Sequence, residues 1–200
     1  MPQHQYNQPK NSSAETLFKD KGSKFFGYVF PVYSEEDVHI ALDKLKSIHS
    51  KARHFCYAWQ LGNTYDRFRV NDDGEPSNSA GMPIYGQIKT KELTNCLIVV
   101  VRYFGGTKLG VGGLINAYRT VANIALEETS IITKDITKTI IISCGYDLMN
   151  DVMRIVKELK LDISHQELKA DCKFHIKIPL QEYNNVSERF KNIYGLSITY

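Results

Sequence analysis

The feature that most constrains the fold is the stretch NCLIVVVRYFGGTKLGVGGLINAY, which runs from Asn95 to Tyr118. It begins with the apolar run Cys96–Val101, which is far too short to span a membrane and has the length of a buried β-strand. A glycine-rich segment, Gly105–Gly113, follows. The apolar residues after it recur at the spacing of an amphipathic helix. A buried strand, a glycine-rich connection and a helix in succession predict a domain that contains both sheet and helix.

The same patterns predict further elements in the first part of the chain. Ser34 and Asp37 have the spacing of a capping box at a helix start. Residues 71–88 crowd acidic residues and glycines together and offer almost nothing to bury, which indicates a loop. The expected strands are residues 23–32, 53–62, 64–70 and 95–104, and the expected helices are residues 34–52 and 112–128.

The second part of the chain follows a compact pattern after a weakly periodic segment at residues 129–138. Strands and helices alternate there in the order β-α-β-β-α-β, which is the order of a ferredoxin-like domain. We therefore predict an α+β protein with an N-terminal domain at residues 1–130, whose residues 1–15 are frayed, and a C-terminal domain at residues 136–200. The C-terminal elements are strands at 139–145, 161–168, 172–178 and 196–200, with helices starting near Asp147 and after Pro179.

Composition excludes several classes of protein. The net charge of +3 is too small to indicate indiscriminate binding of nucleic acid. The N-terminus lacks the apolar segment of a signal peptide, so we expect a cytoplasmic protein with no membrane partner. The four cysteines lie far apart in apolar stretches and form no C-x-x-C pair, so we expect reduced, buried thiols and no structural metal.

The glycine run has two interpretations. It matches neither the P-loop nor the dinucleotide-binding pattern, because Val111 and Gly112 stand where the P-loop has Lys and Ser or Thr. Glycines before a helix could still expose backbone N–H groups to a phosphate or carboxylate, with Arg102, Lys108 and Arg119 nearby. Alternatively, they could serve only to allow a tight connection and close packing.

The acidic loop has three interpretations. Asp72, Asp73 and Glu75 could bind a divalent cation, although they match no EF-hand spacing. They could instead form a turn in which Gly74 takes a positive φ. In the third interpretation, Asp73 or Glu75 pairs with Arg102 or Lys108 across a shared groove.

Other residues that could carry chemistry give weaker signals. The chain has no nucleophile elbow, and His54 has the pattern of a packed strand residue. His165 and His175 could meet across a hairpin, but two histidines alone are a weak metal signal. Aromatic residues flanked by basic ones, including Tyr85, could stack with single-stranded nucleic acid or simply belong to the core.

Two long motifs identify a family resemblance. The segments DDGEPSNSAGMPI (72–84) and RYFGGTKLGVGGLINAY (102–118) resemble the signature of the YigZ/IMPACT family. Ser23–Phe25 and Ala52–Ala58 fit the family's upstream elements, so that the resemblance covers nearly the whole chain.

This resemblance implies a fold and a link to translation. It implies an N-terminal domain of the ribosomal-protein/elongation-factor type, with a βαβ-rich sheet covered by helices on one face. The implied C-terminal domain is ferredoxin-like and similar to the last domain of elongation factor G. Eukaryotic relatives regulate translation, and nucleic-acid binding is the activity usually suggested for bacterial members.

We therefore expect a non-enzymatic protein, with no cofactor and no catalytic residues, that is linked to translation. It would bind RNA, the ribosome or a translation-related protein in a groove between residues 72–83 and 102–113. One alternative is a pure protein-interaction module, and another is a metal-assisted enzyme acting on a phosphorylated substrate. The candidate ligand-binding residues are Asp72, Asp73, Gly74, Glu75, Pro76, Arg102, Tyr103, Phe104, Gly105, Gly106, Lys108, Gly110, Gly112 and Gly113.

Overall fold

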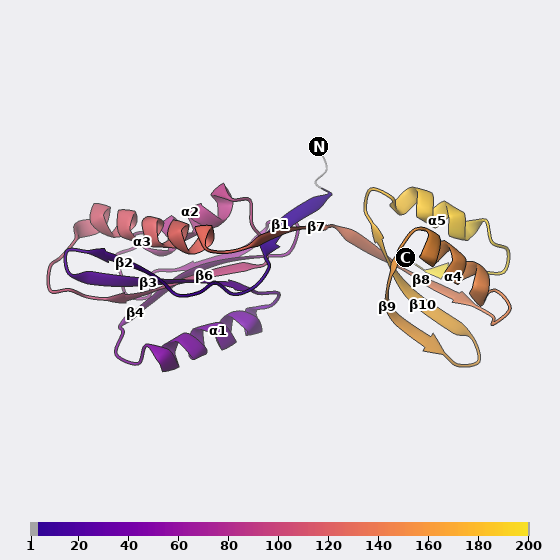
Figure 1. The fold of residues 1–200 in the computed structure, drawn as a ribbon, viewed down its shortest axis with the longest axis horizontal. Helices are drawn as coiled ribbons and strands as arrows, with labels where there is room; N and C mark the ends of the chain where they lie inside the picture. The colour runs from indigo at the N-terminus through magenta and orange to yellow at the C-terminus, as the bar shows by residue number, and fades with distance from the viewer. Residues whose placement is uncertain (1–3, 200) are drawn as a thin grey trace. The chain divides into compact units, whose positions relative to one another are not determined.

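The computed structural model describes residues 4–199, and the expectations for residues 1–3 and 200 lie outside that range. The chain divides into two compact units, one formed by residues 6–134 and the other by residues 4–5 and 135–199 (Figure 1). The division falls inside the weakly periodic segment 129–138. Among the described residues, no helix is long and apolar enough to cross a membrane.

A five-stranded antiparallel sheet forms the first unit, with β6 at its centre. β3 and β4 run alongside β6 on its two sides, so α1 connects two strands that are separated by a third. The strands in spatial order are β2 (Thr16–Asp20), β3 (Ser23–Pro31), β6 (Cys96–Tyr103), β4 (His54–Leu61) and β5 (Arg67–Asn71). The helices are α1 (Glu35–Ile48), α2 (Gly81–Thr90) and α3 (Gly110–Glu127).

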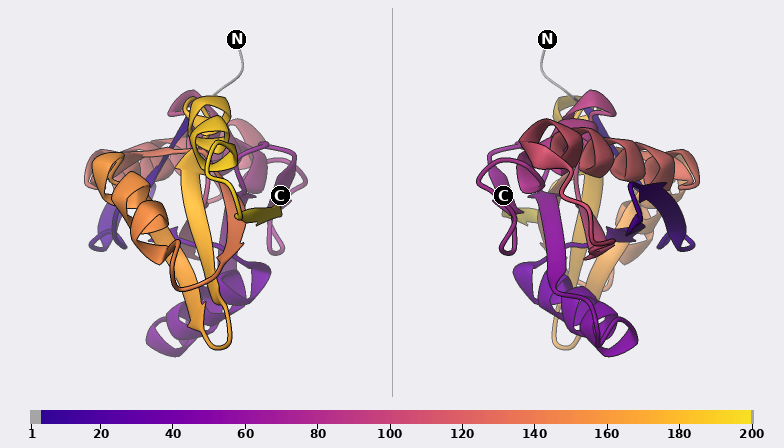
Figure 2. Two further views of the ribbon diagram at one scale, coloured as in Figure 1. Left: turned by 90° about the vertical axis from the view of Figure 1, so that its right-hand side faces the viewer. Right: turned by 90° about the vertical axis from the view of Figure 1, so that its left-hand side faces the viewer.

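Helices cover both faces of this sheet, which corrects the expectation of helices on one face only. Alternate residues of β6 point to opposite faces, and its whole apolar run Cys96–Val101 is fully buried. Ile98 and Val100 pack in the core beneath α2 and α3, whereas Val99 and Val101 pack in the core beneath α1. Figures 1 and 2 show α1 on one side of the sheet and α2 with α3 on the other. An unbroken apolar strand needs such cover on both sides.

The expectation of a loop throughout residues 71–88 is wrong, because α2 begins at Gly81. Ile84, Tyr85 and Ile88 are buried against the sheet, so this segment does contribute to the core. Pro83 is compatible with the helix because it lies in the first turn, where backbone N–H groups have no intrahelical partner. The glycines and the acidic turn that precede the helix concealed this pattern.

The start of the chain is also more ordered than expected. β1 (Gln5–Pro9) pairs with β7 (Ile131–Asp135) in a separate two-stranded sheet, so residues 5–9 are not frayed. Gln8 is buried and accepts a hydrogen bond from Asn95 at 3.2 Å. These polar contacts pair residues far apart in sequence, which a local pattern cannot reveal.

The second unit confirms the ferredoxin-like order read from the sequence. Its four-stranded sheet has the order β11-β8-β10-β9, and α4 and α5 contribute Val152, Ile155 and Phe190 to the core on one face. His165 and His175 lie opposite each other on neighbouring strands, with ring centroids 5.2 Å apart. The elements are β8 (Thr137–Cys144), α4 (Met149–Glu158), β9 (Asp162–Leu168), β10 (Cys172–Pro179), α5 (Tyr183–Lys191) and β11 (Ser197–Thr199).

A buried histidine lies between α1 and the sheet of the first unit. His49 is 6% exposed, and its ring nitrogens lie 2.6 Å from the Tyr28 hydroxyl and 3.1 Å from the Tyr103 hydroxyl. Because Tyr28 donates its proton to Glu15, Nε2 of His49 donates to Tyr28 and Nδ1 accepts from Tyr103. Burial lowers the pKa of His49, and the Glu15 carboxylate only partly opposes this effect.

We predict that His49 makes folding stability depend on pH. Since the pKa is lower in the folded state, the unfolded chain binds the proton more readily as the pH falls below the ordinary histidine value of about 6.5. The free energy of unfolding should therefore fall with decreasing pH, by up to about 1.4 kcal/mol per pH unit from this group.

Urea unfolding of wild type and His49→Gln between pH 5 and 7.5 measures the effect, and the slope should be smaller in the variant. His39→Gln, at an exposed position on α1, is the control and should keep the wild-type slope. An unchanged slope in His49→Gln would contradict the assignment.

Candidate functional site

Both motifs of the sequence analysis meet at one end of the five-stranded sheet. β6 ends there beside the first residue of β4, and Arg102 and His54 are direct partners across the two strands. The DDGE loop (residues 72–75) follows β5, and the glycine loop (residues 104–109) follows β6. Antiparallel pairing thus brings together segments that are about 50 residues apart in sequence.

A buried ion pair joins the DDGE loop to the end of β6. Nη1 of Arg102 lies 2.6 Å from Oε1 of Glu75, and the two side chains are 6% and 4% exposed. Glu75 also accepts a hydrogen bond from the Tyr118 hydroxyl at 2.8 Å, while Nη2 of Arg102 lies 3.4 Å from the Ser23 hydroxyl. The third interpretation of the acidic loop, in which a carboxylate pairs with a basic residue of the other motif, therefore describes Glu75 and Arg102.

The two aspartates of the DDGE loop hold the backbone around them. The Asp72 carboxylate accepts hydrogen bonds from the N–H groups of Asn78, Ala80 and Gly81 at 2.8–2.9 Å, which caps the start of α2. The Asp73 carboxylate accepts from the N–H of Phe55 at 2.6 Å. The turn interpretation also applies, because the N–H of Glu75 donates to the Asp72 carbonyl and Gly74 has φ +83°.

All three acidic side chains of the DDGE loop thus form hydrogen bonds or an ion pair with other groups of the protein. Among residues 4–199 there is no group of three His, Cys, Asp or Glu side chains placed to hold a metal ion.

The glycine loop uses its glycines for packing and for backbone conformation. A Cβ on Gly105 would lie 1.9 Å from the carbonyl carbon of Gly22, so only glycine fits this approach of two chain segments. Gly106 and Gly110 have φ values of +88° and +74°, which favour glycine. At Gly112, by contrast, a Cβ would meet no atom within 4 Å. The close-packing interpretation therefore holds for part of the run, while the loop itself stays exposed to solvent.

A groove of about 340 Å³ is lined by residues of both the DDGEP segment and the glycine loop. We call it the loop groove. Val111 and Phe104 contribute exposed apolar surface to it, Lys108 contributes a cation, and the Glu75–Arg102 pair lies at its side. Its lining residues are Glu75, Pro76, Arg102, Phe104, Lys108, Leu109, Gly110, Val111 and Leu114.

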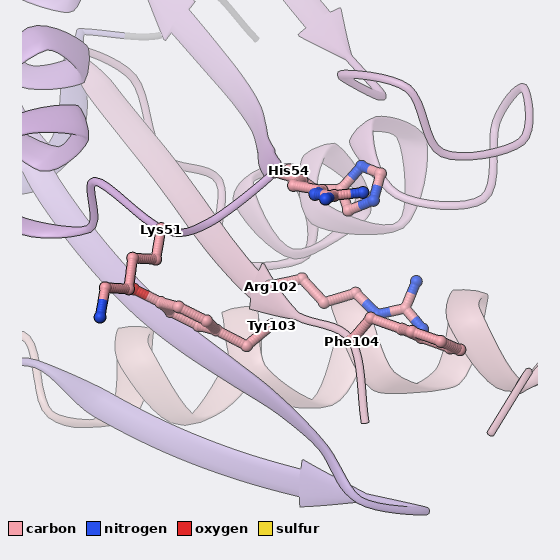
Figure 3. A pocket seen from close by; sticks show the side chains of 6 residues that line it. Lys51, His54, Arg102, Tyr103 and Phe104 are labelled. Atoms are coloured by element: carbon pink, nitrogen blue, oxygen red, sulfur yellow. The ribbon is translucent and has the colours of Figure 1, made fainter. Parts of the chain in front are cut away.

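A second cavity, of about 370 Å³, shares Arg102 and Phe104 with the loop groove, and we call it the cationic pocket (Figure 3). Its other lining residues are Lys51, Arg53, His54 and Tyr103. Lys51 and Arg53 were not among the predicted site residues, and His54 was expected to be a packed strand residue. The available signal was the basic segment before β4, but its relevance depends on the pairing of β4 with the end of β6.

Several candidate residues lie elsewhere than expected. Tyr103 points to the α1 face of the sheet, opposite to Arg102, and its hydroxyl bonds to His49. Tyr85 belongs to the core and stacks on Phe68 with ring centroids 4.6 Å apart. Arg119 is exposed on α3 and lines neither cavity. Burial raises the pKa of the Cys56 thiol beside Tyr118, which keeps it protonated.

We predict that Gly105→Ala destabilises the protein and Gly112→Ala does not. The added methyl group at Gly105 would overlap the backbone of Gly22 and Ser23, and such overpacking typically costs about 1–3 kcal/mol. At Gly112, a helical position with open space, alanine should stabilise by about 0.5–1 kcal/mol. Thermal unfolding followed by circular dichroism measures both variants. Equal melting temperatures for the two variants would refute the packing role of Gly105.

We also predict that Glu75→Gln destabilises the protein far more than Glu35→Gln. Removing one charge of a buried pair leaves the other uncompensated, which costs about 3–5 kcal/mol. Glu35 pairs with Arg67 at 3.7 Å, but both side chains are more than half exposed, and such pairs contribute at most about 1 kcal/mol. Urea unfolding compares the two variants at neutral pH. A loss in Glu75→Gln no larger than in Glu35→Gln would show that the buried pair is not a structural constraint.

Comparisons with known proteins were made against family models, curated proteins and solved structures. The model of the Impact N-terminal domain matches residues 21–126. The chain is similar to IMPACT family member YvyE of Bacillus subtilis, with 29% identity over 92% of this chain and 85% of that protein. It is 31% identical to an IMPACT family member of Haemophilus influenzae, over 76% of this chain and 74% of that protein. A crystal structure of a hypothetical protein shares the fold, with a TM-score of 0.77, 24% identity and coverage of 98% of this chain and 97% of that one.

Proposed function

Because this chain belongs to the IMPACT family, we propose that it takes part in the regulation of translation, as a non-enzymatic protein that binds RNA at the end of its first sheet. The RNA would lie across the cationic pocket and the loop groove, free or as part of the ribosome. Its phosphates would contact basic side chains, and its bases would stack on exposed aromatic rings.

The observation that supports this proposal is a set of exposed cations around the two cavities. Lys51, Arg53 and Lys108 are exposed, and within residues 4–199 none of them forms an ion pair. The carboxylates of the neighbouring DDGE loop are turned to internal partners. Asp73 is itself exposed, so the positive charge at this end of the sheet is offered to a ligand mainly in the cationic pocket, whose described lining has no Asp or Glu.

An exposed aromatic ring accompanies these cations. Phe104 is 55% exposed and lies between the two cavities, and the Arg102 guanidinium is 5.5 Å from its ring centroid. Basic residues that follow a backbone, with aromatic residues on which bases stack, are the usual means of binding single-stranded nucleic acid.

Burial decides which basic residues can be replaced in a binding test. Arg102 is buried and paired, so its removal would damage the fold as well as any RNA contact. Lys51 and Lys108 each line one of the two cavities that share Arg102, are exposed, and form no ion pair within residues 4–199. Replacing these two lysines therefore tests RNA binding without disturbing the fold.

We predict that Lys51→Ala/Lys108→Ala weakens the binding of a short single-stranded RNA at least tenfold. Fluorescence anisotropy at several salt concentrations measures this loss, and the salt slope should also fall by roughly 0.7 for each phosphate contact removed. Lys44→Ala/Lys91→Ala is the control, because it removes the same charge outside both cavities and should retain binding.

Two results would overturn the proposal. One is no RNA binding by the wild-type protein, and the other is binding that both double variants weaken equally. Pull-down experiments with translation factors would then test the protein-interaction alternative at the loop groove, whose exposed Val111 and Phe104 are apolar.

A further inference from the structure

We infer that the cationic pocket is a site for one nucleotide, which holds a single phosphate between Lys51, Arg53 and Arg102 and stacks its base on Phe104. This inference rests on the proposed function and gives that RNA-binding surface a defined subsite. The ligand class is a nucleoside monophosphate, either free or as the terminal residue of an RNA.

The positive charge of the pocket favours an anionic ligand. Its six described lining residues include three cations and a histidine but no Asp or Glu, whereas the loop groove includes Glu75. Lys51 and Arg53 are exposed and can reach a bound group from the open side, while Arg102 is fixed in the wall. A phosphate is the common biological anion that three basic groups suit.

Arg102 has a hydrogen-bond donor left over. Its Nη1 is used by Glu75 and its Nη2 by Ser23, but its Nε–H is buried and has no partner among the described residues. A buried donor without a partner is costly and rare in native proteins. Arg102 lines the pocket, but its Nε has almost no exposed surface, so an entering phosphate oxygen would have to displace the atoms that cover this nitrogen before it could accept from the donor.

The pocket also has groups suited to the rest of a nucleotide. Figure 3 shows the Arg102 side chain between His54 and the ring of Phe104. Phe104 is exposed enough to accept a stacked base. Because the Asp73 carbonyl accepts a hydrogen bond from Nδ1 of His54 at 2.9 Å, Nε2 of the neutral ring is an acceptor for a ribose hydroxyl. The volume of about 370 Å³ is within the range of small-molecule sites.

The test measures binding of UMP, AMP and inorganic phosphate by isothermal titration calorimetry to the full chain. We expect both nucleotides to bind at least tenfold more tightly than phosphate. Lys51→Ala/Arg53→Ala should weaken all three at least tenfold. Phe104→Ala should weaken the nucleotides at least fivefold and leave phosphate unchanged. Phe68→Ala, which removes a half-exposed ring outside the pocket, should change none of them.

A comparison of RNA ends identifies the source of the nucleotide. If the pocket takes the end of an RNA, a 5′-phosphorylated oligonucleotide should bind more tightly than the same chain with a 5′-hydroxyl, and UMP should compete with it. If it takes a free nucleotide, both oligonucleotides should bind equally and UMP should not compete. Both outcomes support a nucleotide site and differ only in its source.

Other outcomes overturn the inference. No binding of any nucleotide at millimolar concentration excludes the site. Equal affinity for phosphate and nucleotides, unaffected by Phe104→Ala, shows a site for anions alone. If RNA binding depends on Lys51 and Lys108 but mononucleotides do not bind, the nucleotide subsite is refuted while the proposed function stands.

Discussion

The buried ion pair between Glu75 and Arg102 is the interaction on which the rest of the site depends. It closes two loops onto the end of β6 at a nitrogen–oxygen distance of 2.6 Å, with both side chains almost fully removed from solvent. Two buried charges are stable only with good geometry and further hydrogen bonds, and Tyr118 and Ser23 supply these. The shapes of the loop groove and the cationic pocket follow from this pair, because Arg102 forms part of both walls.

Around the pair, acidic and basic residues have separate tasks. Asp72 and Asp73 hold backbone N–H groups of α2 and β4, so their charges serve the fold. Lys51, Arg53 and Lys108 stay exposed, so their charges remain available to a ligand. The DDGE motif thus holds the site in shape. Of its residues, only Glu75 lines the binding surface. This division explains how a chain with a net charge of only +3 can offer a local basic surface.

Much of the fold could be predicted because its signals are local. The capping box of Ser34 and Asp37, the apolar run of β6 and the alternation of β10 each fix one element within a few residues. The elements that were missed depend on distant partners. α2 receives its cap from Asp72, which lies nine residues before the helix start, and β1 is ordered by pairing with β7. Such partners lie outside any local window of the sequence.

The sequence by itself determined the ferredoxin-like order of the second unit, the family resemblance and the two loops that form the groove. Only the tertiary structure decided which charges are free. Antiparallel pairing placed His54 beside Arg102 and brought the neighbouring Lys51 and Arg53 to the same cavity, although neither of the two long motifs includes them. Tyr103 points to the face of the sheet opposite to that of Arg102, because successive side chains of a strand alternate. Burial and strand register are properties of the folded chain, and they decide whether a basic residue holds the protein together or can meet a ligand.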